Sequence, residues 1–414
     1  MSRITARRLR LACALAVAAA VASAGPARAQ AKEVVTFAAA IFTEAGRAER
    51  MRAIVERFNA GQTRIEVQPV AMTFATMANT VFTQMGGGGG PDLIRFDYID
   101  YFAAVAAKRV VPLDDVIKDG DHNFRAAPDK ALKVEGRRFG VVFDTTGYTL
   151  LYNPTLLPGG APPKDFDAFV KLAKDVTKDG TYGFAFRATM AERAGFWQDL
   201  CNFVYGFGGR WSDESGRLTI NGPKVVEGVR AYKTMYESGA IPKGTDAATY
   251  RRMFWEGKLA MEVDNGGVGA ILTQQNPNLP LKAAFSPFPS RDQGLILTAL
   301  AVNANTKVNG ASITFMKWLL EPAQQRAIQD ALGTNSGVEV ERTAEERAKS
   351  PWLEAFDQQS AHSVSQLVTG HEVKTPEIQQ IVLEQVLKVL QGGMDAQKAM
   401  DEAQRIVERR VLRP

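Results

Sequence analysis

Short apolar runs alternate with amphipathic stretches along the first hundred residues of the chain. Residues 34–39 form an apolar run typical of a buried strand. Met51, Ile54, Val55 and Phe58 then recur at the spacing of a single helix face. Two further strands are predicted at 65–67 and 91–96, again with a helical stretch between them. This order predicts a parallel sheet covered by helices.

The rest of the chain repeats the alternation. A helix is predicted from Phe166 with Asp165 as its N-cap, and the C-terminal part reads as two helices separated by Gly392 and Gly393. No long linker interrupts the pattern, although 414 residues suggest two or three domains. We therefore expect α/β domains joined by several short crossings. Further strands are predicted at 182–186, 259–263 and 295–302, and a further helix at 313–320.

The N-terminal segment changes the meaning of the net charge of +5. Residues 1–10 carry four arginines, 11–22 are apolar, and Ala-Arg-Ala at 27–29 fits a cleavage site, so residues 1–29 are predicted to be a secretory signal peptide. The segment holds five arginines and no acidic residue, which leaves 45 basic and 45 acidic side chains. A neutral mature chain gives no support for a nucleic-acid partner. We expect a soluble protein of the periplasm.

Catalytic and metal-binding motifs are missing from the sequence. It contains neither a G-x-S-x-G elbow nor an H-E-x-x-H pair, and its histidines, at 122, 362 and 371, are far apart. Cys201 is the one cysteine after the signal segment, so no disulfide is expected within the mature chain and a buried thiol is predicted. We predict no enzyme, no metal and no cofactor. Glycoside cleavage requires two carboxylates at a set separation. That separation depends on the three-dimensional structure, so the sequence does not exclude such a pair.

Several motifs follow one another in an order that resembles a known family, the extracellular solute-binding proteins of bacterial ABC importers. The resemblance is to the carbohydrate-type group that includes the maltodextrin-binding proteins, and it extends over nearly all of the mature chain. The segments that carry it are Phe-Asn at 58–59, GPDLI at 90–94, AKRVVPLDD at 107–115, LLYN at 150–153, GTYGF at 180–184 and FWEGKLAM at 254–261.

The resemblance implies an α/β fold of two lobes (the type II-like periplasmic-binding-protein fold), each a mostly parallel sheet flanked by helices, with a ligand cleft between them. We expect residues 30–144 plus 290–335 in the first lobe and 145–289 plus 336–414 in the second. Crossings between the lobes make natural hinges for closure. The resemblance further implies a monomer that delivers its ligand to an ABC permease in the membrane.

Candidate ligand-binding residues follow from the rule that ligands lie beyond the carboxyl ends of strands in open α/β sheets. Aromatic rings and carboxylates gather at these positions, a mixture that suits a sugar, which offers an apolar face and a rim of hydroxyls. From the first lobe we predict Phe42, Glu44, Asp97, Tyr98 and Asp144, and from the second Tyr148, Trp197, Asp264 and Asn265.

Two alternatives remain at this point. An anionic ligand such as a glycerol phosphate ester would be held at residues 43–46, before a predicted helix, together with Arg291 near a crossing. A periplasmic glycan-processing enzyme would use the same cleft for turnover.

Overall fold

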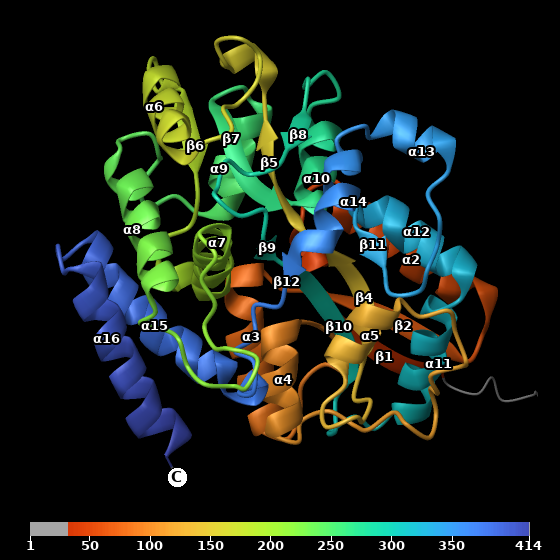
Figure 1. Ribbon diagram of the computed structural model, residues 1–414. Helices are drawn as coiled ribbons and strands as arrows, with labels where there is room; N and C mark the ends of the chain where they lie inside the picture. Colours follow the sequence, from red (N-terminus) through yellow and green to blue (C-terminus); the bar gives the residue numbers. More distant parts are fainter. Residues whose placement is uncertain (1–31, 414) are drawn as a thin grey trace, which may run out of the picture.

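The protein has two lobes of α/β structure, shown in Figure 1. The computed structural model describes residues 32–413, so the predicted signal peptide lies outside the described residues. Within 32–413, no helix is both long and apolar enough to cross a membrane.

The first lobe is built on a six-stranded sheet with the order β11-β4-β10-β3-β1-β2. Parallel pairing of β1 with β2 and β3, and antiparallel pairing of β10 with β3 and β4, make β1 to β4 run in one direction. The strands are β1 Glu33–Ala39, β2 Ile65–Ala71, β3 Leu93–Asp97, β4 Val141–Thr146, β10 Ile296–Val302 and β11 Asn335–Ser336.

Helices cover both faces of this sheet. One apolar core packs under α2, α11 and α12, and the residues of α3 and α4 belong to a second core on the other face. The helices of this lobe are α2 Arg47–Gly61, α3 Phe74–Gly86, α4 Tyr98–Ala106, α5 Ala126–Leu132, α11 Asn309–Leu319 and α12 Pro322–Leu332.

The second lobe has a four-stranded sheet with the order β6-β7-β5-β8. Here β6 is parallel to β7, and β5 is antiparallel to both β7 and β8. Its strands are β5 Tyr148–Tyr152, β6 Tyr182–Ala185, β7 Leu259–Asn265 and β8 Lys282–Ala284. Its helices are α6 Phe166–Val176, α7 Arg193–Gly206, α8 Pro223–Glu237, α9 Ala247–Trp255, α10 Gly266–Gln275, α14 Leu353–Gln359, α15 Thr375–Leu390 and α16 Ala396–Val407.

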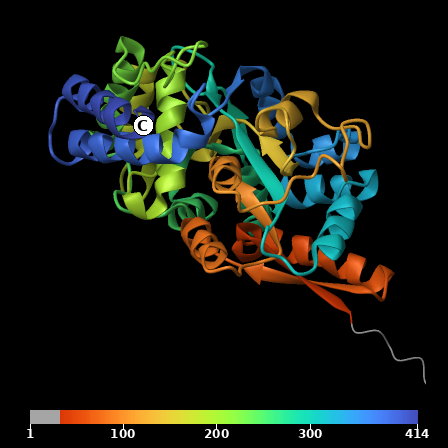
Figure 2. The same cartoon turned by 90° about the horizontal axis from the view of Figure 1, so that it is seen from below.

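The two C-terminal helices complete the second lobe. Figure 2 shows α15 and α16 side by side on its outer part, and in Figure 1 they lie next to α8. Side-chain oxygens of Asp165 and Asp395 accept hydrogen bonds from the first turns of α6 and α16, at 2.9 and 3.1 Å. The predicted N-cap Asp165 is therefore confirmed.

The chain crosses between the lobes more than once. It leaves the large sheet at the end of β4, enters the small sheet at the start of β5 after Gly147 alone, and returns through β9 Gln293–Gly294 to β10. After β11 it passes α13 Ala344–Lys349 and reaches β12 Ser363–Val364, which pairs with β9. The predicted two-lobe α/β fold is confirmed. Both strands that carry the chain into a new sheet, β5 and β10, pair antiparallel with their neighbours. The division of the chain at residues 144, 289 and 335 stays a proposal.

Candidate functional site

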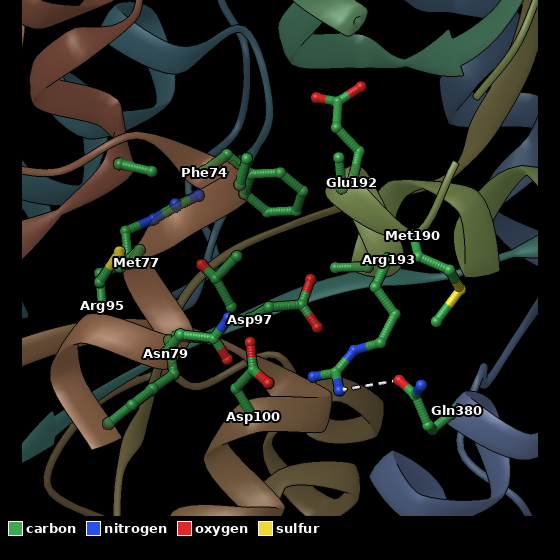
Figure 3. Close-up of a pocket in the computed structure, with 17 residues that line it drawn as sticks. Phe74, Met77, Asn79, Arg95, Asp97, Asp100, Met190, Glu192, Arg193 and Gln380 are labelled. Atoms are coloured by element: carbon green, nitrogen blue, oxygen red, sulfur yellow. Dashed lines mark hydrogen bonds between the residues drawn. The ribbon is translucent and has the colours of Figure 1, made fainter. Parts of the chain in front are cut away.

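A cavity of about 270 Å³ lies between the two lobes. Figure 3 shows its wall from the first lobe, with Phe74, Asp97 and Asp100, facing side chains from the start of α7 and from α15. The strands β1, β2 and β3 end at this cavity, as expected for a ligand site of an open α/β sheet. Its polar and large apolar lining residues are Phe74, Met77, Asn79, Arg95, Phe96, Asp97, Asp100, Met190, Glu192, Arg193, Thr298 and Gln380.

Asp97 occupies the junction between β3 and α4. Its Oδ1 caps α4 by accepting a hydrogen bond from the main-chain N–H of Ile99 at 3.1 Å. Its Oδ2 accepts from Nε2 of Gln198 on α7, at 3.2 Å, so this carboxylate joins the two lobes. Burial raises the pKa of Asp97 to about 6, because a charged carboxylate loses hydration there.

Asp100 lies in the first turn of α4 and also faces the cavity. Burial, together with the nearby charge of Asp97, raises the pKa of Asp100 to about 7, and the charge of Arg193 opposes this rise only in part. Two carboxylates with pKa values near neutrality are therefore placed side by side on one helix N-terminus. Both can accept hydrogen bonds when ionised, and either can donate one when protonated.

A buried ion pair supports the cavity from the strands below it. Arg95 on β3 donates to Oδ1 of Asp144 on β4 through Nη2 at 2.6 Å and Nε at 3.1 Å. Thr298 on the intervening strand β10 also donates to this oxygen, and Thr334 donates to Oδ2 at 3.2 Å. Burial opposes ionisation of Asp144, but the charges of Arg95 and Arg47 hold its pKa below the ordinary value. The charge of Arg95 is thus already neutralised before any ligand binds.

The second lobe contributes the opposite wall through the start of α7. Arg193 donates from Nη1 to Oε1 of Gln380 on α15 at 3.4 Å, drawn as a dashed line in Figure 3. Glu192 accepts a hydrogen bond from the main-chain N–H of Ala247 at 3.0 Å, which anchors the turn that precedes α7. Arg193 makes no ion pair among the described residues, so its guanidinium keeps free donors toward the cavity.

Phe74 is the exposed aromatic ring of the site. It begins α3, directly after β2, and 38% of its surface is exposed although large apolar side chains are usually buried. Together with Met190 it gives the cavity an apolar flank between the polar groups.

Some of the residues predicted from the sequence lie at the cavity, whereas others are buried away from it. Asp97 lines the cavity, and Asp144 holds Arg95 beneath it. Tyr98 and Trp197 are buried and meet at one residue, Gln366: its N–H donates to the Tyr98 hydroxyl, and its carbonyl accepts from Nε1 of Trp197 at 3.1 Å. Trp197 also stacks on Trp211, with ring centroids 4.6 Å apart.

Three further candidates from the second lobe lie in or beside its sheet. Tyr148 and Asp264 are fully buried, and Asp264 pairs with Arg251 at 2.8 Å. Asn265 caps α10 by accepting from the N–H of Gly267 at 3.0 Å. None of these side chains lines the cavity of about 270 Å³.

The remaining candidates also lie outside this cavity. Phe42 is buried against Phe37 with ring centroids 5.3 Å apart, and Glu44 pairs with Arg47 at 2.6 Å at the start of α2. Arg291 is exposed and lies over the ring of Phe285, 4.3 Å from its centroid.

Sequence reasoning missed most of the second-lobe wall and part of the first. Phe74 follows β2 and could have been found by applying the strand-end rule to the second strand as well as to the first and third. Arg193 follows β6 by eight residues, whereas the aromatic pair at 196–197 drew attention further into the helix. Gln380 comes from α15, far along the chain, and carried no sequence signal.

Comparison with models of protein families identifies the family of this chain. The model of the bacterial extracellular solute-binding protein family matches residues 44–326, which is more than half of the sequence. The chain belongs to this family. It is a family of binding proteins, and its members are extracellular. A search of curated proteins finds no match for this solute-binding protein.

Solved structures resemble this solute-binding protein over almost its whole length. An ABC transporter solute-binding protein from Thermotoga lettingae, bound with α-D-tagatose, is 18% identical with a TM-score of 0.80, and 91% of this chain and 99% of that chain are covered. MalE3 of T. maritima, bound to maltose, is 19% identical with a TM-score of 0.79 and the same coverage. UgpB from Mycobacterium tuberculosis, in complex with glycerophosphocholine, is 17% identical with a TM-score of 0.74, covering 91% and 98%. At such identities the likeness establishes the fold.

Proposed function

We propose that the cavity between the lobes binds a sugar and that this protein delivers it, unaltered, to an ABC permease. The observation that carries the proposal is the lining itself: carboxylates at Asp97 and Asp100, donors at Arg193 and Gln380, and an exposed ring at Phe74 line one cavity. A pyranose presents hydroxyls to the first set and an apolar C–H face to the ring. Several solved structures of the same fold contain maltose, maltotriose or other sugars.

Both lobes are required for this binding. Asp97, Asp100 and Phe74 belong to the first lobe, and Arg193 and Gln380 to the second. A ligand shifts an open–closed equilibrium only through contacts that it gains in the closed form, so a site divided between the lobes couples binding to closure. Hydrogen bonds to charged groups contribute roughly 1.5–3 kcal/mol each, and a micromolar ligand needs about −8 kcal/mol.

The charge and size of the cavity favour a small neutral sugar over an anion. When ionised, the two carboxylates repel a phosphate, and the charge of Arg95 is already paired with Asp144, which leaves Arg193 as the free cation among the described lining residues. A volume of about 270 Å³ lies just below the roughly 300–1,000 Å³ usual for ligand pockets. We therefore propose one or two sugar rings as the ligand.

Thermal unfolding across a panel of monosaccharides and disaccharides tests the proposal. We expect at least one sugar to raise the unfolding temperature of the native protein, and Asp100→Asn to lose most of that rise. Asp167→Asn, which removes an exposed carboxylate on α6, is the matched control and should keep it. If no sugar acts, or if both variants respond alike, the assignment fails.

Unaltered release is tested separately. The protein is incubated with the sugar that binds best, and the sugar is then analysed by mass spectrometry. Recovery of intact sugar in a one-to-one complex supports a binding protein, whereas cleaved sugar would support the glycan-processing alternative.

We propose, finally, that residues 1–29 are removed on export and that the mature protein is a periplasmic monomer. Its first residue would then be Gln30. Mass spectrometry of the exported protein and its mass in solution by light scattering test the two parts: a chain that retains residues 1–29 contradicts the first, and a stable dimer the second.

A further inference from the structure

A second cavity, of about 1010 Å³, shares no lining residue with the first. Residues 145–147, where the chain crosses from β4 to β5, form part of its wall. The start of α5 and the strand β11 line it from the first lobe, and Phe356 and Asp357 of α14 line it from the second. This cavity therefore touches both lobes at a crossing between them.

Two arginines in this cavity are anchored on the same short strand. Arg125 donates from Nε to the carbonyl of Ser336 at 2.9 Å. Arg342 donates from Nη2 to the carbonyl of Thr334 at 3.0 Å and to Oδ1 of Asn335 at 3.2 Å. Both arginines are thus anchored at residues 334–336, and they lie close enough for the charge of Arg125 to help lower the pKa of Arg342.

Both guanidinium groups have N–H donors that are not used in the hydrogen bonds to residues 334–336. Among the described residues, neither Arg125 nor Arg342 forms an ion pair within 4.0 Å of a carboxylate. Nε of Arg342 is buried without any hydrogen-bond partner. An unpaired buried donor costs free energy, and charged side chains are seldom buried without a partner.

In the part of the chain that the structure describes, acidic side chains around the cavity form no ion pair with either of these arginines. Asp357 pairs with Arg347 at 3.7 Å, and Glu339 and Glu341 are exposed. Burial lowers the pKa of both Arg125 and Arg342, in spite of the attraction of Asp357 for each. Glu339 and Asp357 attract Arg125, and Asp357 and Glu346 attract Arg342, but none of these carboxylates pairs with either guanidinium within 4.0 Å among the described residues.

We propose that Arg125 and Arg342 form a second ligand site that binds a phosphate-type oxyanion, either inorganic phosphate or a phosphomonoester. The planar fork of an arginine matches two oxygens of a phosphate, and two neighbouring forks use more oxygens than one carboxylate offers. The cavity is larger than a phosphate requires, so the group attached to an ester is accommodated as well. Arg347 also lines this cavity, where it pairs with Asp357.

Titration calorimetry at constant ionic strength, with inorganic phosphate and separately with glycerol 3-phosphate as the probe, tests the site. We expect saturable binding of at least one probe, weakened about tenfold or more by Arg125→Gln and by Arg342→Gln. Arg342→Lys, which keeps the charge but loses the fork, should bind with intermediate affinity. Arg64→Gln, an exposed arginine of the first lobe, is the matched control and should bind as the native protein does.

The outcomes separate this site from the sugar cavity. Arg193→Gln should leave phosphate binding unchanged; loss of binding in that variant would place the anion in the first cavity and overturn the proposal. Absence of saturable binding by either probe up to roughly 10 mM would overturn it too. Circular dichroism without phosphate establishes that each variant is folded. Since the sugar test uses Asp100, failure of one proposal does not decide the other.

Discussion

The Asp97 carboxylate at the end of β3 accepts a hydrogen bond from Nε2 of Gln198 on α7, 3.2 Å away, and so connects the first lobe to the second at the edge of the cavity. Gln198 is buried, with 4% of its surface exposed. The contact joins the lobes, because Asp97 ends β3 of the first and Gln198 lies on α7 of the second.

Removal of this contact is expected to weaken ligand binding. Gln198→Ala should raise the dissociation constant of the bound sugar roughly tenfold, since a hydrogen bond to a charged group contributes about 1.5–3 kcal/mol. Calorimetry measures the change. Gln358→Ala removes an exposed glutamine on α14 and should leave affinity within about twofold of native. Equal affinities in the two variants would contradict a role for Gln198 in closure.

The raised pKa values of the cavity carboxylates predict a pH-dependent stability. The folded protein favours protonated Asp97 and Asp100, with pKa values of about 6 and about 7 against the ordinary 3.8. Their contribution is therefore fully present below about pH 4 and is lost as the pH rises through 6 and 7. Asp100→Asn should gain roughly 1–2 kcal/mol over the native protein at pH 8 and little at pH 4.

Urea unfolding of the two proteins at both pH values measures this difference. Asp167→Asn serves as the control for loss of an exposed carboxylate. An effect of Asp100→Asn that is the same at pH 4 and pH 8 would show that Asp100 titrates normally in the folded state.

Phe74 should matter for ligand binding and little for folding. Because 38% of its surface is exposed, Phe74→Ala is expected to lower the free energy of unfolding by no more than about 1 kcal/mol while it weakens sugar binding roughly tenfold. Val34→Ala is the control, since Val34 is 41% exposed and far along β1 from the cavity. Calorimetry and urea unfolding report the two effects separately, and unchanged affinity would exclude Phe74 from the site.

Trp197 is expected to contribute to the stability of the fold. It is fully buried, stacked on Trp211 and bonded to the carbonyl of Gln366. Trp197→Ala should lower the free energy of unfolding by about 3–5 kcal/mol. Trp255→Ala, at a half-buried tryptophan, should cost clearly less. Near-native stability of Trp197→Ala together with lost sugar binding would instead support the ligand role that the sequence predicts.

The Arg95–Asp144 pair is expected to behave as one unit. Asp144→Asn leaves a largely buried guanidinium without its carboxylate and should cost about 3–5 kcal/mol of stability. The double variant Arg95→Gln/Asp144→Asn should cost less than the sum of the single changes, because no unpaired charge remains. Chemical unfolding of the native protein and the three variants measures the coupling; additive costs would contradict it.

Secondary structure was largely readable from the sequence. The strands β1, β6, β7 and β10 lie where apolar runs predict them, and Asp165 caps the predicted helix. Such features depend on local physics: side-chain period, N-caps and the effect of glycine on a helix end. The order of short motifs likewise identified the family.

Side-chain roles were harder to predict where a helix is buried on all sides. Every residue of α7 from 195 to 206 is buried, so its sequence has no polar face to separate ligand-facing positions from the core. The sequence therefore predicted Trp197 as a ligand contact and not Arg193, and only the packing of α7 separates their roles. Tyr98 posed the same problem, because its hydroxyl is bonded to Gln366, far along the chain.

By itself, the sequence determined the α/β class and the sheet edge at which Asp97 lies, because these follow from periodicity and from the direction of the strands. The order of its short motifs added the resemblance to a two-lobe family. Only the tertiary structure decided which side chains surround the cavity. Phe74, Arg193 and Gln380 come together from three helices distant in sequence, and their exposure depends on how the lobes pack, which no local pattern encodes.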